Sequence, residues 1–169
     1  MKVYFGHRLF TPENPTWGDP VVTIHDVITR DVTRDVTRDA DAIRHCECRP
    51  LAIVTYHSPD GIEWGYPGSG PADLALSILT DYFEETPEQV LRALKSLWAP
   101  RSKAAALHQR FKAEFLANEL RDQWQIRADV IEVWLRLPSV RVCLERLAEE
   151  DAELAEVRAL EEVEHGTAN

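Results

Sequence analysis

The sequence is short of basic residues, and this shortage narrows the partners that it can have. Its 19 Lys and Arg are outnumbered by 29 Asp and Glu, which gives a formal net charge of -10 over 169 residues. A broad face that binds duplex nucleic acid needs clustered Lys and Arg to neutralise the phosphates. We therefore expect no direct duplex partner. An acidic protein of this kind suits the basic surface of another protein instead.

Cysteine and long apolar runs are scarce as well. The three cysteines are an odd number, so they cannot all pair in a disulfide framework. No apolar run approaches the roughly 20 residues of a membrane-spanning helix, and the first residues lack the apolar core of a signal peptide. These absences predict a cytoplasmic protein in a reducing setting, with no membrane partner.

One short segment, His45-Cys46-Glu47-Cys48, concentrates metal-ligand residue types. A zinc site usually combines two spaced pairs of ligands, and here only His57 or Cys143 would be left to complete the set. We expect neither a metal site nor a cofactor.

The first sixty residues are typical of β structure. Residues rich in β-branched and aromatic side chains recur in three segments, 2–9, 20–27 and 50–57, and we predict an antiparallel sheet of about three strands. Between the second and third segments, Thr-Arg-Asp-Val repeats with a period of four over residues 29–39. We interpret residues 29–48 as an insertion in a tolerant loop, and the repeat fits a helix better than a strand.

From Pro71 onward the apolar period is that of helices, and Pro71 itself suits a first helical turn. The pattern of this helix predicts a polar face opposite the apolar one, formed by Asp73, Ser77, Thr80, Asp81 and Glu84. A second helix is predicted from Thr86 to before Pro100, with Leu97 and Trp98 on its apolar face. Two more are predicted at about 102–120 and 127–135, the last with Val130 inward. The predicted fold class is α+β, a small N-terminal sheet followed by a bundle of four to five helices.

Residues 139–164 predict one long terminal helix of strongly acidic character. Nine Asp and Glu stand there against three Arg, on a helix with a narrow apolar stripe. Such a helix suits docking on a partner or on a second copy of the chain. We predict that Val140, Leu144 and Leu147 hold it on its own domain, and that binding uses Leu154, Glu156, Val157 and Glu161. Residues 1–137 then form one α+β domain, and residues 138–169 an acidic extension.

The segment from His57 to Pro71 holds four glycines and three prolines. Its glycines could deliver backbone amides to an anion at the start of the next helix, although a shaped turn that packs Trp64 and Tyr66 is the favoured interpretation. As a binding surface it would use Trp64, Tyr66, Gly68, Ser69 and Gly70. The alternative is acid/base chemistry by His57, Asp60 and Glu63.

The same segment carries a resemblance to a known family. The chain resembles a family of small domains of unknown function that phages, plasmids and other mobile elements encode. The resemblance rests on the segments Val3-Tyr4-Phe5-Gly6-His7-Arg8, His57-Ser58-Pro59, Glu63-Trp64-Gly65-Tyr66, Gly68-Ser69-Gly70-Pro71-Ala72 and Gln109-Arg110-Phe111-Lys112. Asp60 and Pro67 depart from the usual pattern of that family, as do the long 29–48 loop and the terminal helix. The resemblance implies an α+β fold and a mobile-element setting, and it implies no reaction.

Together these patterns favour a non-enzymatic interaction or inhibitor protein of a phage or mobile element. Its expected partner is a host protein with a basic surface, in defence or nucleic-acid metabolism. The alternative is a small enzyme or a nucleotide- or phosphate-binding module centred on residues 57–71.

Overall fold

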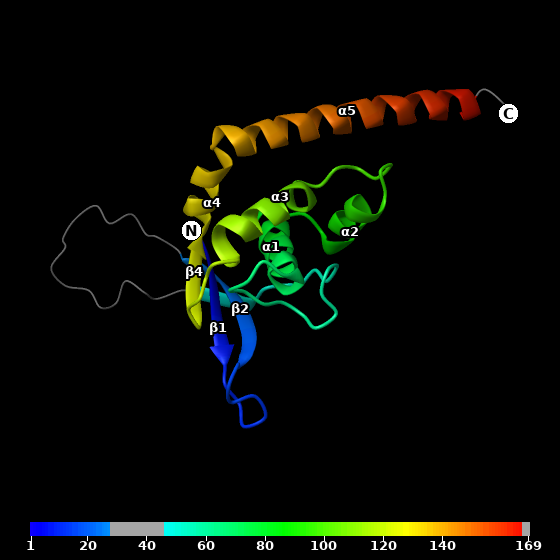
Figure 1. Cartoon of the computed structure of the whole chain (residues 1–169). Helices are drawn as coiled ribbons and strands as arrows, with labels where there is room; N and C mark the ends of the chain where they lie inside the picture. Colours follow the sequence, from blue (N-terminus) through cyan, green and yellow to red (C-terminus); the bar gives the residue numbers. More distant parts are fainter. Residues whose placement is uncertain (28–45, 167–169) are drawn as a thin grey trace, which may run out of the picture.

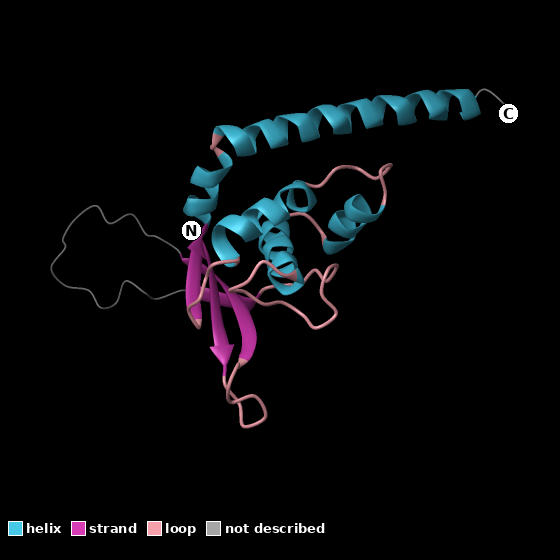
Figure 2. Cartoon of the chain, in the orientation of Figure 1, coloured by secondary structure: helices cyan, strands magenta, loops and turns pink. Residues whose placement is uncertain are grey.

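The computed structural model describes residues 1–27 and 46–166 and has an α+β fold, as predicted (Figure 1). Four antiparallel strands form one sheet in the order β3-β2-β1-β4, with helices packed on one face (Figure 2). The strands are β1 (Lys2–Leu9), β2 (Asp19–Val27), β3 (Cys46–Pro50) and β4 (Gln123–Arg127). The helices are α1 (Ser69–Tyr82), α2 (Pro87–Lys95), α3 (Lys103–Phe111), the π-helical turn η1 (Lys112–Leu116), α4 (Ala128–Leu135) and α5 (Pro138–Gly166). The predicted helix over residues 29–39 lies outside the described residues.

The helix-facing side of the sheet forms one wall of the core. Alternate strand residues point inward there, as the period of two requires, namely Tyr4, Val22, Ile24, Trp124 and Ile126. β1 is central and pairs with β2 on one side and with β4 on the other. Gly6 lies opposite Trp124, and a Cβ at Gly6 would lie only 2.2 Å from the Trp124 ring. The absence of a side chain at Gly6 therefore lets the indole lie flat on β1.

The third strand is shifted from its predicted position, and a fourth strand was not predicted. β3 covers Cys46–Pro50; the Leu51 amide still donates to Val22 O of β2 at 3.0 Å, and residues 52–58 belong to no strand. In the 51–58 segment Leu51 and Val54 are buried at a spacing of three, not two. The Val54 amide donates to Ser77 Oγ at 2.9 Å. The amides of Val54 and residues 56–58 thus use side chains of α1 as acceptors in place of a neighbouring strand.

α1 is buried on all sides from Gly70 to Thr80, which corrects the predicted polar face, of which Asp81 is partly exposed and Glu84 is exposed. Asp73, Ser77 and Thr80 are 0–4% exposed. Ser77 and Thr80 donate their hydroxyls to carbonyls one turn earlier, Asp73 O and Leu76 O, both at 2.7 Å. Buried polar groups need such partners. Asp73 and Ser77 therefore face the 51–58 segment and not solvent.

The next helices begin where their capping residues predict. Thr86 and Gln89 form a capping box on α2, and Ser102 Oγ accepts from Ala105 N at the start of α3. α2 ends at Lys95, earlier than predicted, so Leu97 and Trp98 are 81% and 67% exposed. The predicted 102–120 helix ends at Leu116 after the η1 turn. Val130 on α4 is 44% exposed, not inward as predicted, while Ile131 and Trp134 are buried.

α5 is the long terminal helix that the sequence predicts. It extends past α3 and α2, so that its C-terminal end lies far from the sheet (Figure 1). Val140 is fully buried and Leu154 is 8% exposed. Between them the Arg101 amide donates to Asp151 Oδ1 at 2.9 Å, and Arg101 Nε lies 3.3 Å from Glu150 Oε2. The contacts of α5 with the rest of the chain therefore extend past Leu147 to Leu154. Within residues 1–27 and 46–166 every helix is too short or too polar to cross a bilayer.

A charged cluster around Asp81 fastens the end of α1 to the sheet. The Asp81 carboxylate accepts from Lys2 Nζ and Tyr4 Oη, both at 2.8 Å, and also from the Arg49 guanidinium. Burial by itself would raise the pKa of Asp81, but the bonds from Lys2, Arg49 and Tyr4 outweigh it and hold that pKa below its usual value. Burial, reinforced by the Asp81 charge, raises the pKa of the Tyr4 hydroxyl.

Asp81→Asn is expected to reduce stability at neutral pH by about 1–3 kcal/mol, because three donors lose a charged acceptor. A carboxyl with a lowered folded pKa stabilises the fold above its unfolded pKa, near 3.8, and this stabilisation is lost as the pH falls further. Urea unfolding between about pH 7 and pH 2 should therefore show a flatter acid dependence in Asp81→Asn than in the wild type. Asp60→Asn, at an exposed turn, is the control. An unchanged acid slope in Asp81→Asn would contradict the assignment.

Candidate functional site

The glycine-rich segment is pinned to the body of the protein by Trp64. This side chain is 3% exposed and meets the Trp124 ring edge-on, with centroids 5.7 Å apart. Its Nε1 donates to Arg121 O at 2.9 Å, and the Arg8 guanidinium lies 4.5 Å from the ring centroid. Hydrogen bonding of a buried indole and a cation over its face both favour one fixed position. Trp64, predicted as a binding residue, is therefore also a buried anchor.

The remaining predicted loop residues pack on one another. A Cβ at Gly68 would lie 1.9 Å from the Tyr66 ring, and one at Gly70 would lie 2.7 Å from Glu63 Cβ. The space that these two glycines leave is thus filled by the chain itself. Gly65 has a φ of 89°, which favours glycine. Tyr66 is 44% exposed and Ser69 is exposed at the start of α1, so these two are the accessible members of the set.

The three predicted acid/base residues have different partners and do not contact one another through hydrogen bonds in the described part of the chain. Glu63 is held in a two-bond ion pair by Arg8, at 2.7 and 3.0 Å, and its Oε1 also accepts from its neighbour's backbone amide. Asp60 is exposed in the turn. Among the described residues no hydrogen bond joins His57 to either carboxylate. His57 instead turns towards α3.

A buried carboxylate, Asp73, holds the start of the segment. Its oxygens accept the backbone amides of His57 and Ser58, both at 2.9 Å, and that of Tyr56 at 3.2 Å. An ionised carboxyl that collects several amides is a strong, charge-assisted arrangement. This role could not be predicted from the sequence. Asp73 lies on the polar side of the helical pattern, where an aspartate ordinarily faces solvent.

Next to Asp73, His57 meets His108 and Gln109 of α3. The two Nε2 atoms are 2.9 Å apart, and the rings are stacked with centroids 5.0 Å apart. Gln109 Nε2 lies 2.9 Å from His108 Nε2 and 3.5 Å from His57 Nε2. Burial lowers the pKa of His108, against the bond from its Nδ1 to Ala105 O at 2.7 Å. The sequence indicated His57 as a candidate site residue, but it did not indicate His108 or Gln109 as its partners.

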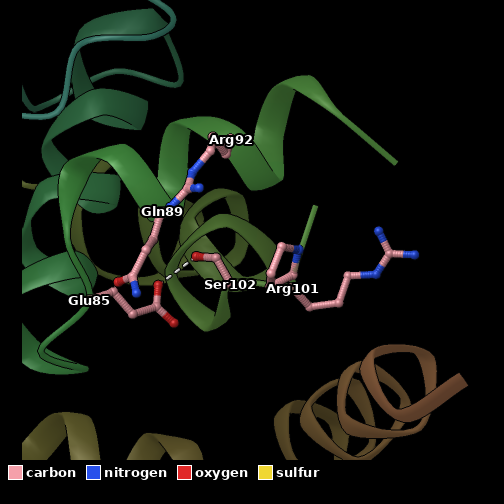
Figure 3. Close-up of a pocket in the computed structure, with 6 residues that line it drawn as sticks. Glu85, Gln89, Arg92, Arg101 and Ser102 are labelled. Atoms are coloured by element: carbon pink, nitrogen blue, oxygen red, sulfur yellow. Dashed lines mark hydrogen bonds between the residues drawn. The ribbon is translucent and has the colours of Figure 1, made fainter. Parts of the chain in front are cut away.

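Three cavities border the connection between α2 and α3, away from the glycine-rich segment. One, of about 170 Å³, is lined by Glu85, Gln89, Arg92, Pro100, Arg101 and Ser102 (Figure 3). Glu85 accepts from Ser102 Oγ at 2.5 Å and from Lys103 N at 2.8 Å. Glu85 thus occupies the anion-favouring start of α3. The Arg101 side chain points away from this cavity in Figure 3.

A second cavity, of about 290 Å³, lies between this connection and α5. It is lined by Leu97, Trp98, Arg101, Glu150, Glu153, Leu154 and Val157. Of the residues predicted to bind through α5, Leu154 is buried, Val157 is 41% exposed and Glu156 is exposed. The side chain of Glu161 lies outside the described ones. The exposed Leu97 and Trp98 are the part of this surface that the sequence did not predict.

Residues 29–97 match a family of unknown function, DUF6166. This confirms part of the expected resemblance, which was drawn over a longer stretch. No curated protein and no solved structure matches the chain. The matched residues include the segment from His57 to Pro71 and all of α1 and α2. They end at Leu97, so α3 with His108 and α5 with its cavity lie beyond the match.

Proposed function

We propose that the protein is a non-enzymatic interaction protein that binds a basic partner protein through α5 and the connection between α2 and α3. The observation that carries the proposal is the exposed apolar group at this place. Leu97 and Trp98 are 81% and 67% exposed, and they share one cavity with Val157 of α5. Large exposed apolar side chains gathered at one place mark interaction sites, and tryptophan is enriched among the residues that dominate binding.

The charge of α5 supports a basic partner. The cavity is bordered by Glu150 and Glu153, and Glu156 is exposed on the same helix. Arg101 is the cation of this cavity, and it is already paired with Glu150. An apolar centre with an acidic rim complements a segment that carries apolar residues flanked by Lys or Arg.

The proposed partner is a host protein in defence or nucleic-acid metabolism, and the proposed setting is a phage or other mobile element. This part rests on the sequence resemblance and on the acidic charge, which suits the basic surfaces of proteins that handle nucleic acid. A second copy of the chain, docked through α5, is the competing partner.

The alternative, a small enzyme or phosphate-binding module at residues 57–71, stays a prediction. Two contacts weigh against it. Glu63 is occupied by Arg8, and the Tyr66 ring covers the backbone at Gly68. An anion at that backbone would have to displace the ring.

Trp98→Ala is expected to abolish capture of the dominant partner from a host lysate, because it removes the largest exposed apolar side chain of the surface. The full chain should recover one dominant protein, and raising the salt concentration should weaken its capture. Trp17→Ala is the matched control, since Trp17 is 75% exposed at a different place. Recovery of only the chain itself, or equal recovery by Trp98→Ala and the wild type, would contradict the proposal.

A further inference from the structure

Three side-chain atoms from two separate elements converge beside α3. His57 belongs to the segment before α1, and His108 and Gln109 are neighbours on α3. The separations among His57 Nε2, His108 Nε2 and the Gln109 amide nitrogen are 2.9, 2.9 and 3.5 Å. His108 is 4% exposed, whereas His57 is partly exposed. The cluster therefore has a fixed inner member and an outer member that solvent reaches.

The hydrogen-bond donors and acceptors of this cluster do not match one another. The Ala105 carbonyl can only accept, so the 2.7 Å contact places a proton on His108 Nδ1. A neutral His108 then has a single lone pair, on Nε2. His57 Nε2 and the Gln109 amide nitrogen both stand 2.9 Å from His108 Nε2, and His57 Nε2 presents either an N–H or a second lone pair there, according to its tautomer. In one tautomer of His57 a single lone pair then serves two donors, and in the other the lone pairs of the two Nε2 atoms face each other; both are poor hydrogen-bond arrangements.

We propose that His57, His108 and Gln109 bind a divalent first-row transition metal ion, with Zn²⁺ as the reference ion. The oxygen and nitrogen of a glutamine amide exchange places by a flip, so Gln109 can offer its oxygen. When the proton of His57 is on Nδ1, the two Nε2 atoms and this oxygen bring three lone-pair donors within 3.5 Å of one another. With metal–ligand distances of about 2.0–2.1 Å, ligand atoms 2.9–3.5 Å apart subtend about 90–120° at the ion, the range of octahedral and tetrahedral sites.

The surroundings of His108 match those of a metal ligand. A ligating histidine commonly donates its other ring N–H to a carbonyl, which fixes the tautomer, and His108 does so to Ala105. Lys112 disfavours and Asp73 favours a positive charge at His108, so the Asp73 carboxylate offsets part of the repulsion that Lys112 exerts on a cation there. Two imidazoles and an amide oxygen suit Zn²⁺, Ni²⁺ or Cu²⁺.

The site differs from a structural zinc site in its openness. In the described part of the chain no three His, Cys, Asp or Glu side chains converge as a metal-binding group. Two histidines and an amide leave coordination positions for water or for a ligand from outside, as catalytic and regulatory sites do. A bound ion would also link residue 57 to α3.

Calorimetric titration and thermal unfolding with Zn²⁺ test the proposal. The experiment uses the full chain with all three cysteines replaced by serine, so that thiolates cannot bind the ion. We expect this variant to bind one Zn²⁺ ion and to have a higher melting temperature with zinc than without it. His57→Gln in that background should weaken the affinity at least about tenfold. His25→Gln is the matched control, because His25 lies on β2, away from the segment before α1 and from α3.

Co²⁺ absorption supplies a second measurement. The cysteine-free chain should give the d–d bands of nitrogen and oxygen coordination, and these should disappear in His57→Gln. His57 is partly exposed, so this variant should fold, and circular dichroism checks it. His108→Gln repeats the test at the buried ligand. The proposal is overturned if the cysteine-free chain binds no ion, or if His57→Gln binds as tightly as its parent; His57 and His108 are then only a hydrogen-bonded pair.

Discussion

Trp64→Ala should lower the free energy of unfolding by about 3–5 kcal/mol, the usual cost of deleting a buried tryptophan. The indole is 3% exposed and packs against Trp124. Its removal leaves a cavity next to β4, frees the Arg121 carbonyl and takes away the ring beneath the Arg8 guanidinium. Chemical denaturation monitored by far-UV circular dichroism measures the change.

Trp98→Ala is the control for this experiment. It deletes the same side chain from an exposed position, and it should alter the unfolding free energy by no more than about 0.5 kcal/mol. The pair therefore separates an anchor of the fold from a residue of the proposed binding surface. If Trp64→Ala costs as little as Trp98→Ala, the glycine-rich segment is not fastened to the core.

Asp73→Ala should destabilise the protein by about 3 kcal/mol or more. The substitution removes the acceptor of three backbone amides, those of Tyr56, His57 and Ser58. A buried donor left without a partner costs about 1–3 kcal/mol. Because the carboxylate also holds the backbone of His57, amide hydrogen exchange at residues 56–58 should accelerate more than in the centre of the sheet.

Ser77→Ala is the neighbouring control on α1. Ser77 accepts only the Val54 amide and is equally buried, so its loss should cost about 1 kcal/mol. Equal effects of Ser77→Ala and Asp73→Ala, or unchanged exchange at residues 56–58 in the latter, would refute the role given to Asp73.

Elements whose signals are local were predicted well from the sequence. β1 and β2 follow from alternating apolar residues, α2 from its capping box, and α5 from the helical spacing of its apolar residues, which continues on both sides of the acidic residues 149–151. β3 was misplaced because residues 50–57 carry β-branched side chains yet bond to α1, whereas Cys46–Pro50 forms an edge strand of polar composition. β4 was missed although Trp124 and Ile126 alternate, because five residues before a helix give a weak signal.

The residues of the candidate sites divide in the same way, into those with a local sequence signal and those without one. His57 and Trp64 stood out because of the unusual glycine-rich segment around them. His108 and Asp73 did not, because their importance arises from contacts between elements far apart in the chain. Leu97 and Trp98 were assigned to a helix face since their spacing suits one, but α2 ends before them. A periodic pattern does not report where tertiary packing ends a helix.

The central position of β1 also sets an order in time. β1 is synthesised before β4, because it precedes β4 in the chain, yet one of its two edges pairs with residues 123–127. Until that stretch is synthesised, β1 presents an open row of amides and carbonyls, and Gly6 lacks the indole that covers it. Closing this pairing requires a loop of more than a hundred residues, which slows folding. Between the synthesis of β1 and that of β4, the nascent chain thus carries an unprotected strand edge, the kind of surface through which incomplete chains aggregate.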